Sequence, residues 1–257
     1  MSDDRYPFGR PVTSCALDVT GPRPLFVLGA YPSALHVRWT PPAGAPGGAI
    51  RAIPVDDEPE PFWTGGDEAE RIAGWKATVG FVAAWGEAEP VGHLNGSSGV
   101  WVEREVLARF ATKRSDTWIT DCLDRYHAST GVAEALAERF APFADSIGLD
   151  QPALAAHPSE GDIVRVALAD HAQRLTDAIV AAQPTFVVTL GNAALRVLRD
   201  LADVPADAPK KLEAVRGTYG RRVPIELEGH AATWYPLAHP ASPKPFRDQH
   251  GMWRPKL

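Results

Sequence analysis

Four short apolar runs, separated by longer segments with helical periodicity, constrain the fold of this chain more than any other feature. The runs are PLFVLGA (24–30), DTWITDCL (116–123), PTFVVTLG (184–191) and ATWYPLAH (232–239). The first and third are almost wholly apolar, which is typical of strands covered on both faces of a sheet. The pattern therefore predicts four buried strands.

The segments between these runs have the periodicity of amphipathic helices. We predict helices over 67–85, 102–111, 132–143, 159–183 and 192–203. The clearest is 159–183, where Ser159 and Asp162 resemble a capping box. Asn192 directly follows a strand and is expected to cap the helix after it. Strands that alternate with helices predict crossover connections, and therefore an α/β fold with a mostly parallel sheet.

The segment 40–63 is rich in proline and glycine. It is predicted to be a long irregular loop, which more often marks a functional site or a disordered insert than a packed element. The 257 residues are enough for one sizeable core, and we treat 1–257 as one domain.

Composition excludes several classes of function. The formal net charge of -6 argues against a uniformly basic nucleic-acid surface, although not against a local basic patch. Only two cysteines occur, Cys15 and Cys122, with no C-x-x-C, so neither a disulfide framework nor a four-cysteine cluster is expected. No apolar run approaches the ~18 residues of a membrane span, and the acidic start MSDDRYPFGR does not resemble a signal peptide. We expect a cytoplasmic protein without a metal or cofactor.

The residues just after each predicted strand are the candidate site. Ligands of open parallel sheets bind beyond the carboxyl ends of the strands. The corresponding segments are 29–39, 120–127, 190–194 and 239–246. In the last one the tight turn Pro240–Pro243 follows His239, so the histidine is expected at the rim of the sheet.

Taken together, these strand ends resemble the uracil-DNA glycosylase superfamily. Its members have a first-strand motif of the form G-Q-D-P-Y-H, G-I-N-P-G or G-E-A-P-G, then a strand that ends in Asn, an LG strand that leads into a helix, and an H-P-S-P turn. The matching residues here are Gly29-Ala30-Tyr31-Pro32-Ser33, Thr120-Asp121, Leu190-Gly191-Asn192-Ala193 and His239-Pro240-Ala241-Ser242-Pro243. Each motif is weak alone, but four in this order over residues 24 to 247 are moderately specific.

The resemblance implies a fold and a chemistry. The fold is three-layer α/β/α, with a central, mostly parallel four-stranded sheet. The chemistry is removal of a damaged or deaminated base from DNA after the base is flipped out of the stack. His239 would stabilise the anionic departing base, and Asp121 matches the base-recognising Asn. The other substrate-binding positions implied are Gly29, Ala30, Tyr31, Pro32 and Ser242, with Phe62 or Trp63 as a platform on which the base stacks.

The chain departs from the family at its first motif. Tyr31 replaces the catalytic Asp or Asn, and Ala30 replaces the Glu of the third motif form. A positioned general base contributes ~10²–10⁴-fold to a rate, so this loss predicts a slow enzyme unless another acid serves. Asp121 is the candidate, and an ionised carboxylate only accepts hydrogen bonds. It should therefore prefer a base edge with donors, or act as the acid/base group itself.

A local DNA contact is expected in the basic C-terminal segment. Lys244 stands where the family has its apolar wedge, Phe246 could take over that role, and Arg247 adds a cation. The cations of this segment are Lys244, Arg247, Arg254 and Lys256, and those of a second basic segment are Lys210, Lys211, Arg216, Arg221 and Arg222. Such runs are usually solvated faces. We expect DNA, single- or double-stranded, as the partner of a monomer.

Less specific interpretations stay open for every candidate. His239 fits a partly buried histidine bonded to backbone, Asp121 fits a turn cap, Tyr31 fits packing on the next helix, and Phe62 or Trp63 fits the core. At the level of function, the alternatives are a protein of this fold that binds a base or DNA without turnover, and an unrelated α/β enzyme that acts on a small nucleoside.

Overall fold

The computed structural model describes residues 4–15 and 20–255, so the first three residues of the acidic N-terminus and Lys256 of the basic tail lie outside it. The chain forms two compact units. The first comprises Met1–Cys15, Pro32–Gly99 and Arg125–His157, and the second comprises Ala16–Tyr31, Val100–Asp124 and Pro158–Leu257. Each unit draws on three separate stretches, and the single-domain interpretation stays a prediction.

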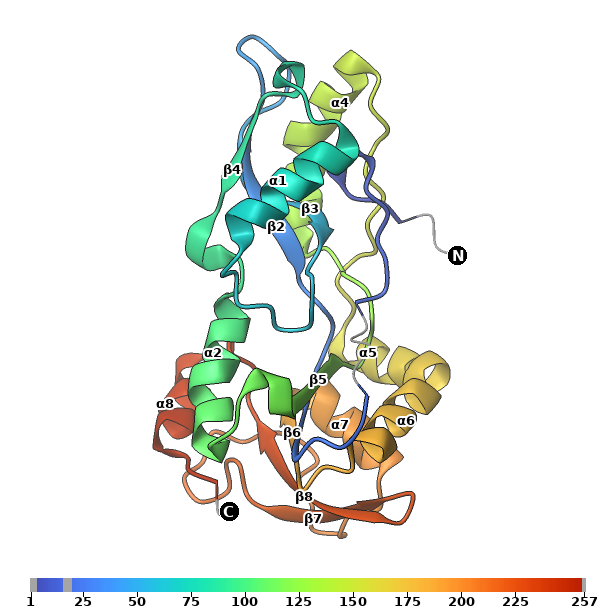
Figure 1. The fold of residues 1–257 in the computed structure, drawn as a ribbon, viewed down its shortest axis with the longest axis vertical. Helices are drawn as coiled ribbons and strands as arrows, with labels where there is room; N and C mark the ends of the chain where they lie inside the picture. Colours follow the sequence, from blue (N-terminus) through green and yellow to red (C-terminus); the bar gives the residue numbers. More distant parts are fainter. Residues whose placement is uncertain (1–3, 16–19, 256–257) are drawn as a thin grey trace. The chain divides into compact units, whose positions relative to one another are not determined.

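The second unit is α/β and contains the four predicted strands. They are β1 (Leu25–Gly29), β5 (Thr117–Asp121), β6 (Phe186–Leu190) and β8 (His230–Leu237), adjacent in the order β5-β1-β6-β8 and mutually parallel (Figure 1). The prediction of these strands and of their parallel pairing is confirmed. Together with the helices of this unit, the sheet is compatible with a three-layer α/β/α arrangement.

The sheet has five strands where four were predicted. The fifth, β7 (Val223–Leu227), lies at the edge and pairs antiparallel with β8. Its residues alternate between buried and exposed, as expected of an edge strand with one face on the core. The turn that joins β7 to β8 has Glu228 and Gly229 at φ of 49° and 76°, the left-handed pair that suits a tight hairpin. Glu-Gly is a weaker hairpin signal than Asn-Gly, which explains why the strand was not predicted.

The predicted helix 159–183 is confirmed as a helical segment with an irregular middle. It consists of α5 (Glu160–Val166), a π-helical stretch (Ala167–His171) and α6 (Ala172–Ala182). The Ser159 hydroxyl accepts the N–H of Asp162 at 3.1 Å, so Ser159 caps α5 as predicted. Three further helices are α2 (Ser97–Glu105), α7 (Asn192–Leu201) and α8 (Lys244–Met252).

The first unit contains a small antiparallel sheet of order β3-β2-β4, formed by β2 (Ala34–Thr40), β3 (Ile50–Asp57) and β4 (Glu87–Pro90). Its helices are α1 (Glu68–Val79), α3 (Thr130–Ala135) and α4 (Ala141–Ile147). The prediction of an irregular loop over 40–63 is wrong in its middle, where β3 lies. The loop was predicted from the proline and glycine content of the segment. β3 is an edge strand, however, and an edge can accommodate Pro54, which has no N–H.

Among the residues that the structure describes, no helix combines the length and the apolar character needed to cross a membrane.

Candidate functional site

The carboxyl ends of the four parallel strands lie level with one another. In the ladders Gly29 pairs with Asp121, Leu28 with Thr189, and Leu190 with Leu237. Two strands, β1 and β6, separate β5 from β8. At roughly 4.8 Å per strand, the ends of β5 and β8 are about 14 Å apart. Asp121 and the chain leading to His239 therefore stand at one rim, on opposite sides of the ends of β1 and β6.

Asp121 is a carboxyl group buried without full hydrogen bonding. The residue is 4% exposed, and its Oδ1 has no hydrogen-bond partner in the described part of the chain. Burial raises its pKa from 3.8 to about 7, against the opposing effect of the nearby Arg174 cation. A buried carboxyl with an unpartnered oxygen is costly for stability, and such groups are typical of functional sites. Near neutral pH it exists both as an acid and as a carboxylate.

Arg174, on α6, holds the end of β5 in place. One of its terminal nitrogens donates to the carbonyl oxygens of Asp121 and Cys122, each at 2.9 Å. The other donates to the Thr120 hydroxyl at 3.2 Å. The guanidinium thus binds the backbone that carries Asp121 and does not form an ion pair with its carboxylate. No sequence signal predicts this role, because Arg174 lies within a helix 53 residues from Asp121 in the chain.

Tyr31 lies near Asp121. The N–H groups of Cys122 and Leu123 donate to the carbonyls of Gly29 and Ala30 at 3.1 and 3.0 Å, so the chain beyond β1 runs beside the chain beyond β5. Tyr31 is partly buried and packs against the hydrophobic core of this unit. Burial and the charge of Asp121 raise the pKa of its phenol. The phenol therefore stays protonated at neutral pH.

The ring of His239 is fixed by the turn that follows it. Its Nδ1 accepts the N–H of Ala241 at 3.1 Å, and its carbonyl accepts the N–H of Ser242 at 2.9 Å. Because Nδ1 is an acceptor, the proton of the neutral ring is on Nε2. Burial lowers the pKa of His239, which favours this neutral form. The backbone hydrogen bond expected from the less specific interpretation is thus present, and it leaves Nε2–H as a donor.

Gly191, just after β6, is a neighbour of His239. It adopts a φ of +95°, which strongly favours glycine. A Cβ at this position would lie 3.7 Å from the Cβ of His239, so the two residues are neighbours. Asn192 does not cap α7 as predicted, because it is the first helical residue. Its Oδ1 instead accepts the N–H of Leu212 at 2.8 Å and anchors the second basic segment.

The predicted DNA-contact residues lie in the first turn of α8. Lys244 is exposed, and its Nζ forms an ion pair with Asp248 at 2.6 Å. Arg247 is exposed and Phe246 is half-buried. Ser242, in the turn before this helix, is half-buried as well. The cations are thus accessible, but one of them is already paired.

Two predicted substrate-binding residues belong to the other unit. Pro32 is buried there, and Phe62 is buried with a left-handed φ of 55°. The alternative platform, Trp63, packs in the hydrophobic core of that unit and donates from its indole N–H to Asp67 at 2.7 Å. The core interpretation therefore holds for Trp63, whereas the stacking role of Phe62 stays a prediction.

The described residues contain no group of three His, Cys, Asp or Glu side chains able to hold a metal ion. Comparison with models of protein families and with curated proteins finds no match to this chain.

Proposed function

We propose that this protein hydrolyses the N-glycosidic bond of a damaged or deaminated base in DNA, with a base preference altered from that of uracil-DNA glycosylases. The observation that carries the proposal is Asp121, a buried carboxyl with an unpartnered oxygen at the rim of a mostly parallel sheet. The motif order in the sequence supports the assignment to this superfamily and its fold.

In the proposed reaction Asp121 and His239 act on opposite partners of the breaking bond. The ionised Asp121 takes a proton from a water molecule as the water oxygen bonds to C1′ of the sugar. The electron pair of the glycosidic bond leaves with the base. Nε2–H of His239 donates a hydrogen bond to an oxygen of that anionic base, which later takes a proton from solvent. Burial lowers the pKa of His239, so the ring is neutral and Nε2–H serves as a hydrogen-bond donor to the developing anion.

Where Asp121 contacts the base and not the attacking water, its protonation state decides which base is preferred. As a carboxylate it accepts hydrogen bonds only, so it favours a base edge that presents N–H donors. Uracil has two acceptor carbonyls beside its one N–H and is the poorer match. As a neutral acid, Asp121 both donates and accepts, and this form is populated below pH 7 because burial raises its pKa to about 7.

A second candidate is a protein of the same fold that binds a nucleobase or DNA without turnover. Tyr31 favours it, because a protonated phenol stands where the family carries a catalytic Asp or Asn. In that case Asp121 would recognise the base and would not activate water.

The test is incubation of excess protein with labelled oligonucleotides that carry uracil, hypoxanthine, xanthine or an alkylated base, single- and double-stranded, followed by alkaline cleavage of abasic sites. Asp121→Asn and His239→Asn are compared with the surface control Asp170→Asn. Product that is retained in the control and lost in both site variants supports the glycosylase. Tight DNA binding without product supports the second candidate. If the protein neither binds the oligonucleotides nor yields product, both candidates are excluded.

A further inference from the structure

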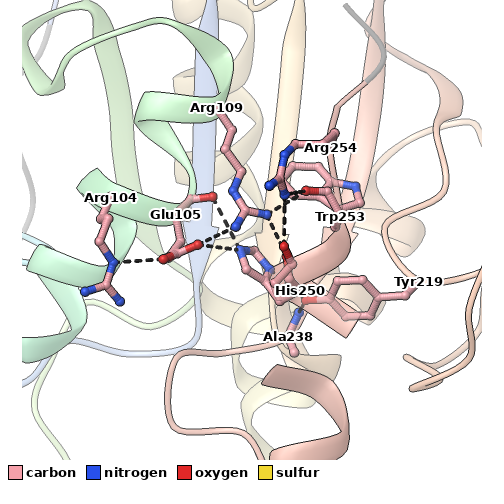
Figure 2. A network of polar contacts seen from close by, with 9 residues as sticks. Arg104, Glu105, Arg109, Tyr219, Ala238, His250, Trp253 and Arg254 are labelled. Atoms are coloured by element: carbon pink, nitrogen blue, oxygen red, sulfur yellow. Dashed lines mark hydrogen bonds and ion pairs between the residues drawn. The ribbon is translucent and has the colours of Figure 1, made fainter. Parts of the chain in front are cut away.

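A partly buried polar network adjoins the residue that precedes His239. It involves Glu105, Arg109, Tyr219, His250 and Trp253, which we call the Tyr219 network (Figure 2). Arg109 donates to the carbonyls of His250 and Trp253 at 2.6 and 2.7 Å and forms an ion pair with Glu105. Its guanidinium also lies over the Trp253 ring, 5.7 Å from the ring centre. These contacts attach the C-terminal residues to the segment that follows α2.

The hydrogen bonds at the centre of the network have a defined direction. The N–H of Ala238 donates to the Tyr219 hydroxyl at 3.0 Å. Because Nε2 of His250 faces a carbonyl and must carry the ring proton, its Nδ1 accepts the hydrogen bond from the Tyr219 hydroxyl, also at 3.0 Å. Nε2–H of His250 then donates to the Glu105 carbonyl at 3.3 Å. Tyr219 and His250 are both buried, and burial holds the pKa of Tyr219 at about 12 and that of His250 at about 4. Both groups are therefore neutral at pH 7, and the direction persists there.

Tyr219 forms a hydrogen bond to the chain just after β8, at a point where β7 no longer pairs with it. Pairing between β7 and β8 extends only as far as Val223 and Trp234. On the opposite edge of β8, the carbonyl of Leu237 still accepts the N–H of Gly191 at 2.8 Å. Since N–H groups of successive strand residues point to opposite edges, the N–H of Ala238 faces the edge that β7 has left. The Tyr219 hydroxyl takes the place of the missing strand there.

We propose that Tyr219, held by His250, is a positioning residue that fixes the backbone at Ala238 and thereby sets the ring of His239 at the rim. The expected effect of Tyr219 on turnover rests on the function proposed above. Its expected effect on the Ala238 backbone and the His239 ring does not. His250 belongs to α8, the same helix that carries Lys244 and Arg247 on its exposed surface. A single helix thus supplies both the predicted DNA contact and the group that holds Tyr219.

The test uses Tyr219→Phe in the full chain, with Tyr6→Phe as the matched control. Tyr6 is also a buried tyrosine whose hydroxyl is hydrogen-bonded, to Asp57 at 2.9 Å, but it belongs to the other unit. The first readout is amide hydrogen exchange at Ala238. Loss of its acceptor should speed exchange there about tenfold more than at Tyr235 or Leu237 in Tyr219→Phe, and not in Tyr6→Phe.

The second readout is the ¹⁵N spectrum of the His239 ring. The native ring should show the Nε2–H form alone, whereas Tyr219→Phe should show a mixture of the two tautomers. His250→Asn, which keeps an acceptor near the position of Nδ1, should retain most of the native spectrum. Equal acceleration of exchange along all of β8, an unchanged His239 spectrum, or the same changes in Tyr6→Phe would each overturn the proposal.

The third readout applies to turnover. If the protein excises a base, Tyr219→Phe should lower the single-turnover rate by about 10²-fold with DNA affinity unchanged, because a displaced catalytic group costs rate and not binding. A lowered affinity at an unchanged rate would contradict positioning. If the native protein shows no excision, the proposed function fails on that result alone, and the exchange and ¹⁵N measurements still decide the role of Tyr219.

Discussion

Gly29 and Asp121 are partners at the last position of the ladder between β1 and β5, and the hydrogen bonds continue past it through Ala30 and Leu123. The carboxyl of Asp121 is therefore carried beside the chain that leads to Tyr31. The group is buried at the edge of the sheet, where a solvent-exposed aspartate would have been less costly. Because burial of the ionised carboxyl lowers the stability of the fold, the role of Asp121 can be tested by unfolding measurements without knowing the substrate.

Replacing Asp121 by Asn should stabilise the protein above neutral pH. The folded-state pKa is raised to about 7 from 3.8, so the unfolded chain ionises first and stability falls as pH rises between these values. Asn removes this loss, which is about 4 kcal/mol at most. Urea unfolding at pH 4 and pH 8 should show little difference from the native protein at pH 4 and a higher midpoint at pH 8. Parallel behaviour of native protein, Asp121→Asn and Asp170→Asn would refute the assignment.

Arg174→Met should both destabilise the protein and raise the pKa of Asp121 further. The substitution leaves the buried carbonyls of Asp121 and Cys122 without their donor, a loss of about 2–4 kcal/mol. It also removes the cation that lowers the Asp121 pKa. Urea unfolding measures the first effect, and carboxyl ¹³C titration the second. Arg165→Met, which breaks only an exposed ion pair with Asp162, should change neither by a comparable amount.

His250 should make the protein sensitive to mild acid. Its folded-state pKa is lowered from 6.5 to about 4, so the unfolded chain binds the proton first and stability is lost as pH falls through this window. The loss approaches about 3 kcal/mol. His250→Asn cannot be protonated and should flatten this part of the stability profile, as measured by thermal unfolding between pH 4 and pH 7. The exposed variant His157→Asn should follow the native curve, and a native-like slope in His250→Asn would exclude His250 as its source.

Asn192→Ala should loosen the basic segment that follows α7. The side chain accepts the N–H of Leu212, and its removal costs about 1 kcal/mol locally. Hydrogen exchange should accelerate at Leu212 while the core of β6 stays protected. Gln173→Ala, on the exposed surface of α6, is the control. Unaltered exchange at Leu212 would show that other contacts hold the segment.

The rate of base excision should depend on pH through Asp121. If its carboxylate takes the proton of water, the single-turnover rate rises about tenfold per pH unit below 7 and levels off above, since burial raises its pKa to about 7. His239→Asn should lower the rate by about 10²–10³-fold without moving this midpoint, because it removes only the donor to the departing base. A rate that falls as pH rises through 7 would assign Asp121 the role of an acid instead.

The α/β class, the parallel strands and the capped start of α5 could all be predicted from the sequence alone. These depend on local pattern: apolar runs with both faces buried, and Ser159 followed by Asp162. The sequence also placed Asp121 and His239 at strand ends, and parallel pairing then brings both to one rim. Its errors lie where local signals were weak or misleading. The edge strand β3 was not predicted because its segment is rich in proline and glycine, and β7 was not predicted because Glu-Gly is a weak hairpin signal.

How the two candidate groups are held depends on contacts that form only in the folded chain. Arg174 reaches the end of β5 and Tyr219 reaches Ala238 from positions that no sequence spacing relates to them. The raised pKa of Asp121 and the Nε2–H form of His239 follow from burial and from single hydrogen bonds. Such properties depend on contacts between residues distant in the chain. The periodicity of a sequence indicates which face of a helix or strand is buried. It does not indicate which hydrogen-bond or charge partners each buried polar group has.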